Sequence, residues 1–473
     1  MNAATRGGRR AAPPRRFRGD RGAVLALALL LIAALAVLLT RSPEPAGPAG
    51  PTTGAVVDRT LLGCPDDPTA RLQSRTQVGL APVEGPDGPL GDSGRLVVGP
   101  AGQGSATKLR RGTARTVESS PAPVLDASGA VAAGLFGFRA DQLGRAGAVG
   151  ACVPPRADWW FTGAGAGLDH LSDLVITNVD PGPAVVDIRV LGEDGEIATV
   201  GTRGVTVAPG DTTRVALADV APQNDEIAVH VQASRGRVAA AVTDRYAPRP
   251  AGPSGLEWLT GTEAPGRLLR LAGLPARSTE RTLLVANPSD LEALVDVEVS
   301  GSRGTFVPAG FETLSVPPGS VRALDMTDML VGKEATAVRL RAQVPVLATV
   351  RSALGSDASN AGTVDPLDGP AAVPVVAGSA TRVQLSAGAG GAKARVAGYD
   401  AGGAPTGKDE VTVDPASTTA WQPKKGTAYV VVTPLSGNVF GAATYAGKDG
   451  LAAAPLLPLP LRLERATVVP APR

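Results

Sequence analysis

The fold is decided by the stretch AVHVQASRGRVAAAV, which runs from Ala228 to Val242. Apolar and other residues alternate on both sides of a short turn, which is the pattern of an antiparallel β-hairpin with one buried face. Similar passages recur roughly every 100 residues, which indicates an internal repeat. The other copies are PVLDASGAVAAGLF (123–136), AVRLRAQVPVLATV (337–350) and AYVVVTPLSGNVFGAATY (428–445).

Two further landmarks recur between these passages. A strand that ends in a turn and returns is expected at LVITNVDPGPAVVDIRV (174–190), LLVANPSDLEALVDVEV (283–299) and VQLSAGAGGAKARVAGY (383–399). A Pro turn joins another pair of strands, as in VTVAPGDTTRVAL (205–217). Six or seven short strands in a unit of about 100 residues predict an all-β fold of antiparallel two-sheet sandwiches, rather than propeller blades of about 40–50 residues.

The composition favours strands and turns and argues against several functions. The 473 residues include 59 Gly and 42 Pro, which is a heavy load for helices. Two His and two Cys are too few for a Cys/His zinc cluster. From residue 22 onward the net charge is −4 and no basic stripe is present, so we expect no nucleic-acid partner. We also expect no cofactor.

The N-terminus predicts one membrane anchor. Residues 1–21 carry seven Arg and one Asp, and residues 22–39 are 18 residues without a charge or a proline. At ~1.5 Å per residue such a helix reaches ~27 Å, close to the thickness of the hydrocarbon core. Arg-rich sequence before the span predicts a cytoplasmic N-terminus and export of the rest. The alternative is a cleaved signal peptide, which the prolines in 43–51 disfavour.

The predicted organisation places tandem β-modules after this anchor. The segments are a basic cytoplasmic tail (1–21), a transmembrane signal anchor (22–39), a Pro/Gly-rich stalk (40–59), a diverged β-module (60–155), three β-sandwich repeats (156–255, 256–371 and 372–455) and a C-terminal tail (456–473). Only the last hairpin of the first module matches the others clearly, so we expect that module to be a partial sandwich.

Cys64 and Cys152 are the only thiols in the chain. In an oxidising exterior two thiols most simply pair with each other, so we predict a disulfide between them. Two unpaired buried thiols are the alternative. The segment 61–64 also resembles a lipobox, but Cys64 lies too far beyond the apolar span for lipidation.

The polar residues suggest no catalytic or metal site. Gly91-Asp92-Ser93-Gly94 resembles the nucleophile motif of chymotrypsin-like serine proteases, but in that family a His precedes the serine and none precedes Ser93 here. His170 and His230 lack partners at ligand spacing, and we expect them at surface or capping positions. The acidic turn at 193–196 lacks the ligand spacing of an EF-hand. We therefore expect no enzyme.

The four Trp residues fall at landmarks shared among the repeats, which favours core packing. TGAG follows Trp159-Trp160-Phe161 and TGTE follows Trp258-Leu259, so we expect these two places to be equivalent. Trp160 and Trp258 are the weak candidates for stacking on a ligand.

Several of these motifs resemble known families. The Asn-Pro turn at 287–288, the alternating Val after it and Val-Pro-Pro-Gly at 316–319 look like bacterial immunoglobulin-like and fibronectin type III-like modules. Cys152, the stretches 159–163 and 283–288, and the anchor resemble an uncharacterised family of actinobacterial exported proteins. The resemblance implies an envelope location and brings no established catalytic residues.

These features together predict a role outside the cytoplasm. We expect a non-enzymatic, membrane-anchored extracytoplasmic protein with an interaction or scaffolding role at the cell envelope. The expected partner is another envelope protein or a cell-wall polymer. The alternative is an accessory protein that binds or processes cell-wall glycan in a groove between the second and third modules.

Overall fold

The strand β13 (Ala184–Gly192) shows why this sequence folds into layers. Ala184, Val186, Ile188 and Val190 are buried, and the residues between them are partly exposed. A strand of this period has one apolar face, which a second layer must cover. Strands of a second sheet supply the other half of the same cluster of buried side chains. Two antiparallel sheets therefore lie face to face around this core.

The computed structural model describes residues 54–66, 75–100, 102–118, 122–143, 146–168, 170–246, 255–308, 313–329, 336–447 and 450–463. The predicted tail (1–21) and anchor (22–39) lie outside this part. Within it, no helix has the length and apolar character needed to cross a membrane. The described residues are almost entirely β-strand, turn and loop, with one short α-helix, α2 (Leu217–Val220), and one 3-10 helix, η1 (Thr327–Met329).

The strands divide into four modules in chain order. The first module contains β1 (Arg59–Gly63), β2 (Arg75–Leu80), β3 (Glu84–Gly85), β4 (Gly88–Pro89), β5 (Gly94–Gly99), β6 (Ser105–Thr107), β7 (Ala114–Glu118), β8 (Val124–Gly129), β9 (Leu135–Leu143) and β10 (Ala146–Ala151). Besides β13, the second contains β11 (Asp158–Ala164), β12 (His170–Thr177), β14 (Gly195–Ile197), β15 (Val205–Val207), β16 (Thr212–Ala216), β17 (Ile227–Arg235), β18 (Ala239–Tyr246) and β19 (Glu257–Leu259).

The last two modules use longer strands. The third contains β20 (Gly266–Leu271), β21 (Glu280–Ala286), β22 (Ala293–Gly301), β23 (Gly304–Phe306), β24 (Thr313–Val316), β25 (Val321–Asp325), β26 (Ala337–Leu354) and β27 (Asp357–Gly362). The fourth contains β28 (Ala371–Pro374), β29 (Ala380–Tyr399), β30 (Pro405–Val413), β31 (Thr418–Trp421), β32 (Tyr429–Ala446), β33 (Leu451–Pro455) and β34 (Leu457–Pro458).

All four modules share one strand order. The first has the sheets β1-β8-β5-β6 and β10-β9-β2-β7, and the second has β11-β17-β13-β14 and β19-β18-β12-β16. In the third, β26 serves both sheets, because β20 and β22 pair with its first half while β21 and β27 pair with its second half. The long β29 and β32 are shared in the same way in the fourth. The first module therefore has the full strand set and is not a partial sandwich.

The repeated passages form strands, but the expected hairpins are wrong. In the second module β12 and β13 lie in different sheets, and so do β15 and β16, and β17 and β18. The alternation of apolar residues reports one buried face for each strand and does not report its pairing partner. The Gly-, Pro- and Ser-containing segments between these strands carry the chain from one sheet to the other.

The expected equivalence of the two Trp sequences is also wrong. Trp258 is on β19, which pairs with β18 of the second module. The third-module strand in the position of β11, which carries Trp160, is β20. Each is the first strand of its module, and they occupy equivalent places because β11 pairs with β17 and β20 pairs with the first half of β26. The second module therefore runs past the boundary predicted at residue 255.

Two buried asparagines mark equivalent turns in the second and third modules. Asn178 follows β12, Asn287 follows β21, and both are fully buried. Nδ2 of each donates to the carbonyl oxygens of the residues 4 and 29 positions later, at 2.7 to 3.0 Å. Oδ1 of each accepts the backbone N–H 2 positions later. The identical contacts indicate that the two modules are copies of one unit.

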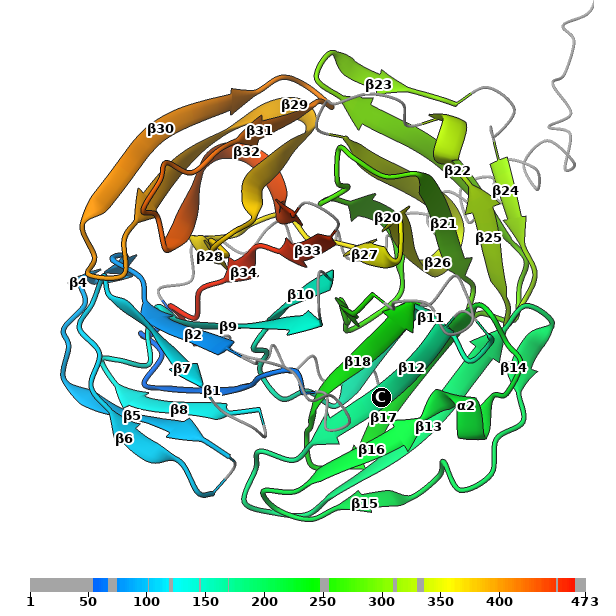
Figure 1. Ribbon diagram of the computed structural model, residues 1–473, viewed down its shortest axis with the longest axis horizontal. Coiled ribbons are helices and arrows are strands. Elements are labelled where there is room, and N and C mark those ends of the chain that lie inside the picture. The colour runs from blue at the N-terminus through cyan, green and yellow to red at the C-terminus, as the bar shows by residue number, and fades with distance from the viewer. Residues whose placement is uncertain are drawn as a thin grey trace, which may run out of the picture. The chain divides into compact units, whose positions relative to one another are not determined.

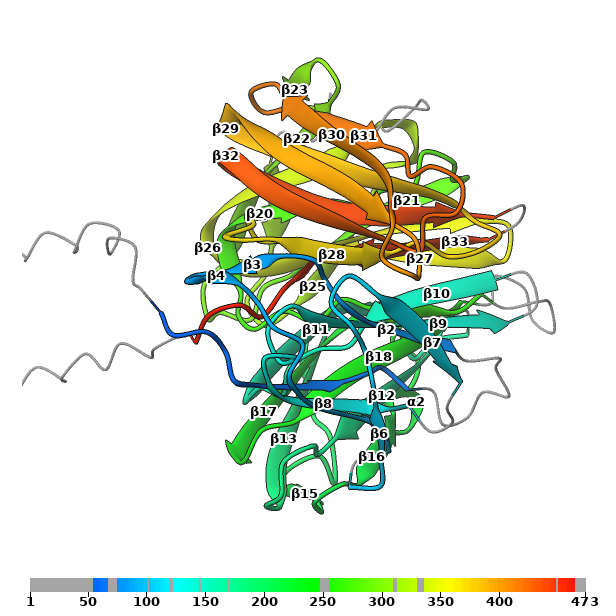
Figure 2. The ribbon, with the colours of Figure 1, turned by 90° about the vertical axis from the view of Figure 1, so that its left-hand side faces the viewer.

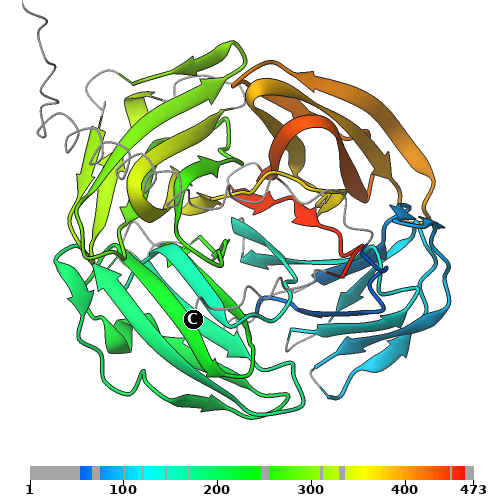
Figure 3. The same ribbon diagram turned by 180° about the vertical axis from the view of Figure 1, so that it is seen from behind.

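Contacts between modules run in a closed circle, as Figures 1 and 3 show from opposite sides. The hydrogen bonds that join neighbours include, in order, Thr243 to the carbonyl of Asp66, Arg351 to Glu226, Ser300 to the carbonyl of Ala416, and Tyr429 to the carbonyl of Gly112. The last of these joins the fourth module to the first. The ring of Tyr429 also lies 4.9 Å from that of Phe136, between centroids.

The two ends of the described chain lie side by side (Figure 2). Val56 and Arg462 form a bridge, and N–H groups of Val57 and Leu463 donate to the carbonyls of Leu461 and Ala55 at 3.2 and 3.0 Å. The last residues of the predicted stalk (40–59) are thereby held against the C-terminal segment and form part of the folded body.

Candidate functional site

A cavity of about 530 Å³ lies where all four modules meet. Its walls are built from the segments 63–66, 149–151, 258–266, 363–367 and 455–458. These segments include the ends of β10, β19 and β33 and the chain just after β27. Concave sites of this size with mostly apolar walls are the usual places for ligands. This cavity is therefore the candidate functional site.

Trp258 lines the cavity but exposes only 3% of its surface. Its ring packs with Ala148 and Leu256. Gly150 approaches so closely that a Cβ atom there would lie 3.0 Å from the ring. The indole Nε1 is buried and has no hydrogen-bond partner among the described residues. Trp258 thus offers a ligand little stacking surface in this conformation.

The charged groups at the cavity are mostly paired. Arg156 lies 3.6 Å from a carboxylate oxygen of Glu263, and its guanidinium is 5.2 Å from the centre of the Trp159 ring. Asp66 is held by Arg139 at 3.3 Å. Asp365 is exposed at the rim. The cavity therefore suits a neutral or cationic ligand better than an anion.

The other Trp that was a stacking candidate is part of an interface between modules. Trp160 is 7% exposed and packs with second- and third-module residues in one buried cluster. It stacks on the imidazole of His230, with 3.7 Å between ring centroids and 7° between planes. His230 Nε2 lies 3.1 Å from Asp158. Burial lowers the pKa of His230, while the hydrogen bond to Asp158 opposes that shift.

Both histidines are buried, so the expectation of surface or capping positions is wrong. His170 Nδ1 lies 3.1 to 3.2 Å from the carboxylate of Asp244, and Ser172 Oγ donates to the same carboxylate at 2.7 Å. In a catalytic triad the histidine stands between the serine and the acid. Here the acid stands between the other two, so this cluster has no route for taking a proton from Ser172 to His170.

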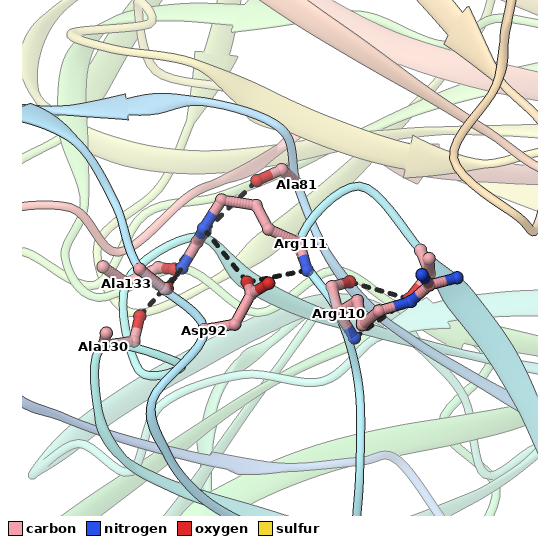
Figure 4. Close-up of polar contacts among 8 residues, drawn as sticks. Ala81, Asp92, Arg110, Arg111, Ala130 and Ala133 are labelled. Atoms are coloured by element: carbon pink, nitrogen blue, oxygen red, sulfur yellow. Dashed lines mark hydrogen bonds and ion pairs between the residues drawn. The ribbon is translucent and has the colours of Figure 1, made fainter.

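In the protease-like stretch, Gly91, Asp92 and Ser93 belong to a loop that holds Arg111 (Figure 4), and Gly94 begins β5. The backbone N–H of Arg111 donates to Asp92 at 2.9 Å. Its guanidinium donates to four backbone carbonyls, those of Ala81, Ala133, Gly91 and Ala130, at 2.8 to 3.3 Å. Arg111 thereby joins three loops of the first module. The contacts of Asp92 in this stretch are structural.

Arg111→Ala is expected to lower the free energy of unfolding by about 2–4 kcal/mol, because several partly buried carbonyls lose their donor. Urea unfolding followed by Trp fluorescence measures the change. The neighbouring Arg110→Ala is the matched control, because Arg110 is exposed and its loss should cost no more than about 0.5 kcal/mol. Equal effects of the two substitutions would contradict this role for Arg111.

No cluster of three or more His, Cys, Asp or Glu side chains with metal-binding geometry occurs among the described residues. In the acidic turn, Glu196 pairs with Arg189 through two hydrogen bonds at 3.1 and 2.6 Å. These hydrogen bonds lower the pKa of Glu196. The carbonyl of Glu193 accepts from Arg322 of the third module at 2.8 Å. The carboxylate of Glu196 and the carbonyl of Glu193 in this turn are therefore already bound by arginines.

The disulfide between Cys64 and Cys152 is confirmed. The two residues follow the first and last strands of the first module, and both are buried in its core. The neighbouring backbone groups of Gly63 and Val153 exchange two hydrogen bonds at 2.8 and 2.9 Å. The bridge therefore closes the first module at the place where the second begins.

Comparison with known proteins identifies a family whose function is unknown. Residues 112–424 match a family of unknown function, DUF5719. The chain belongs to DUF5719. The matched segment begins in the first module and ends in the fourth, so DUF5719 is defined over parts of all four modules. No curated protein matches the chain.

Proposed function

We propose that this protein is a non-enzymatic, membrane-anchored extracytoplasmic protein whose four modules act together as an interaction or scaffolding platform at the cell envelope. Its partner is an envelope protein or a cell-wall polymer, engaged at the cavity where the modules meet. One observation carries the proposal: the fourth module contacts the first, so the modules form one closed body with a shared central cavity.

The position of the chain ends supports tethering. Residues 55–57, in the last part of the predicted stalk, pair with residues 461–463, so the two ends of the described chain lie at one place on the body. We further propose that the family is the exported actinobacterial one that the sequence resembles.

The proposed likeness to immunoglobulin-like modules concerns architecture. In the second module two antiparallel sheets share one core, as in those domains. The connections differ, because the first two strands of the first module, and those of the second, lie in different sheets, whereas the immunoglobulin order ABED and CFG keeps them together.

Photo-crosslinking in intact cells tests the platform proposal. A photoreactive residue replaces Leu268, which lines the cavity and is 68% exposed. The control replaces Val200, which is 93% exposed on the loop between β14 and β15. We expect a discrete adduct with a protein or wall polymer from the cavity position only. A second photoreactive position replaces Asp365, which also lines the cavity. Absence of adducts from both cavity positions, in protein recovered from the membrane fraction, would overturn the proposal.

The membrane anchor is tested by the same material. We expect the full-length chain in the membrane fraction after high-salt washing, because residues 22–39 are apolar throughout. Mass spectrometry of the N-terminal peptide identifies the mature start. Recovery of only a soluble species that begins after residue 42 would show cleavage instead.

Glycan binding is the second candidate, and the hydroxyls of the cavity favour it. Thr260, Thr262 and Thr363 line the same cavity as Trp258. A glycan array with the full chain is the first test, followed by titration of any sugar found. Binding that is lost in Thr262→Val and Thr363→Val but kept in Val200→Ala would favour the glycan role over the pure scaffold. No binding across wall polymers would exclude it.

A further inference from the structure

One strand near the end of each module reaches the centre of the ring. These innermost strands are β10, β19, β27 and β33, and each contacts at least two of the others. Figure 1 shows β10, β27 and β33 there. The four modules are therefore joined at one central place as well as along their sides, and chemistry at that place acts on the whole ring.

Two buried carboxyl groups stand at this centre. Glu257 is 1% exposed and Asp357 is 0% exposed, and they are the first residues of β19 and β27. Glu257 accepts the N–H groups of Trp258 and Ala453 at 2.9 and 3.4 Å. Asp357 accepts the N–H of Leu451 at 2.8 Å.

The two carboxyl groups take the place of a neighbouring strand. Leu451 and Ala453 are two positions apart on β33, so their N–H groups point to the same side. The other side of β33 pairs with β32. Glu257 and Asp357 thereby fasten the free edge of a fourth-module strand to the second and third modules.

No basic side chain is seen to neutralise these carboxyl groups within the described residues. Arg351 of β26 binds Glu226, and Asp244, which stands opposite Glu257 on β18, is held by His170 and Ser172. The remaining ionisable group nearby is the buried hydroxyl of Tyr445 on β32. The described side chains of β10 and β33 carry no charge.

The polar atoms around Asp357 are short of partners as well. Asp357 Oδ1 is buried without a hydrogen bond, and so are the hydroxyls of Ser352 and Ser359. These two serines stand opposite each other on β26 and β27, and Ser359 shares a face with Asp357. The backbone N–H groups of Gly147, Leu256 and Ala358 also face the Asp357 carboxyl and favour its ionised form, but the effect of burial on its pKa is larger.

We propose that Glu257 and Asp357 form a proton-dependent clasp, which holds β33 in the ring when both carboxyl groups are neutral and loosens it when they ionise. Ionisation would place two negative charges in a buried centre where no basic side chain among the described residues pairs with them. The strand that loosens borders a pocket of about 330 Å³ between the first and fourth modules, lined in part by Gly147 and Leu451. The clasp concerns the ring itself and does not depend on the proposed partner.

The acid–base properties of the pair agree with this role. Burial raises the pKa of Asp357 to about 7. Burial, and then repulsion from Asp357, raise the pKa of Glu257 well above its usual value. Between the unfolded and folded pKa values such a group holds a proton only in the folded state, so stability falls as pH rises through that window. For Asp357 the window runs from about pH 4 to 7.

Thermal unfolding of the full chain between pH 5 and 8 tests the clasp. Burial lowers the pKa of His230, which gives an opposite slope, so the variant is compared with the wild type at each pH. The melting temperature of Asp357→Asn minus that of the wild type should rise by about 2 °C per pH unit between pH 5 and 7. Asp365→Asn, an exposed carboxyl, should show no such trend. A flat difference for Asp357→Asn would overturn the proposal.

Amide hydrogen exchange of the wild type gives a second readout that needs no variant. After correction for intrinsic rates, residues 451–455 should lose protection at pH 8 relative to pH 5, by about tenfold or more for one ionised buried carboxyl. Strand β13, in the core of the second module, serves as the internal reference. Unchanged protection of 451–455 across this range would overturn the clasp even if the variants did not fold.

Discussion

Replacing both half-cystines, Cys64→Ala with Cys152→Ala, is expected to lower the free energy of unfolding by about 4–5 kcal/mol, the largest single effect predicted for this protein. The sequence separation is 88 residues, so the bridge removes a large closed loop from the entropy of the unfolded chain. The first module would also lose the link between its first and last strands. Urea unfolding under oxidising conditions measures the change.

Reduction of the wild type supplies the matched control. Wild type in dithiothreitol should unfold with the same midpoint as the double variant, because both lack the bridge and keep small side chains in the core. Intact mass after alkylation with and without reductant confirms the state of the thiols. A double variant as stable as the oxidised wild type would show that the disulfide contributes nothing to folding.

The existence of strands could be predicted from the sequence, but their pairing could not. In the stretch from Ala228 to Val242 the alternating residues form β17 and β18, as expected. Alternation reports that each strand has one buried face, and both sheets of a module bury one face. The same pattern therefore fits a hairpin and a crossing between sheets equally well. In the third module the expected hairpin is a single continuous strand, β26, whose first half pairs in one sheet and whose second half pairs in the other.

The candidate sites were predictable only where one residue type had a single available partner. Cys64 and Cys152 met that condition, and the disulfide was predicted correctly. The chain has 44 acids, so nothing in the sequence could single out Glu257 and Asp357. Their burial depends on four modules meeting at one centre, and the contact of the fourth module with the first has no local sequence signal. The role of Arg111 could not be predicted either, because its partners are backbone carbonyls, which no residue type marks in the sequence.

The segment matched by the family is shorter than the closed ring of modules. DUF5719 is matched over 112–424, which starts within the first module and stops within the fourth. A segment with those ends would lack β1, β2 and β32, and hence Cys64 and the Tyr429 contact that joins fourth and first modules. The unit that folds therefore extends beyond the matched segment on both sides.

Trp160→Ala is expected to lower the free energy of unfolding by about 3–5 kcal/mol, because it empties the centre of the interface between the second and third modules. The indole packs with Leu191 and Ala228 on its own side and with third-module residues on the other, which are Ala286, Val321 and Leu347. Guanidinium unfolding gives the loss. Trp421→Ala is a matched control, since Trp421 is only partly buried and its Nε1 binds the exposed Asp409.

The imidazole of His230 reports whether Trp160 acts through packing. In the wild type the indole covers His230, and burial lowers the pKa of the imidazole. Removal of the indole admits water, so the pKa of His230 in Trp160→Ala should rise, and Asp158 at 3.1 Å favours the protonated form further. NMR titration of the imidazole measures this shift. Trp160→Phe should keep most of the stability and the lowered pKa. A Trp160→Ala variant with unchanged stability and an unchanged His230 titration would instead leave Trp160 as a surface available to a ligand.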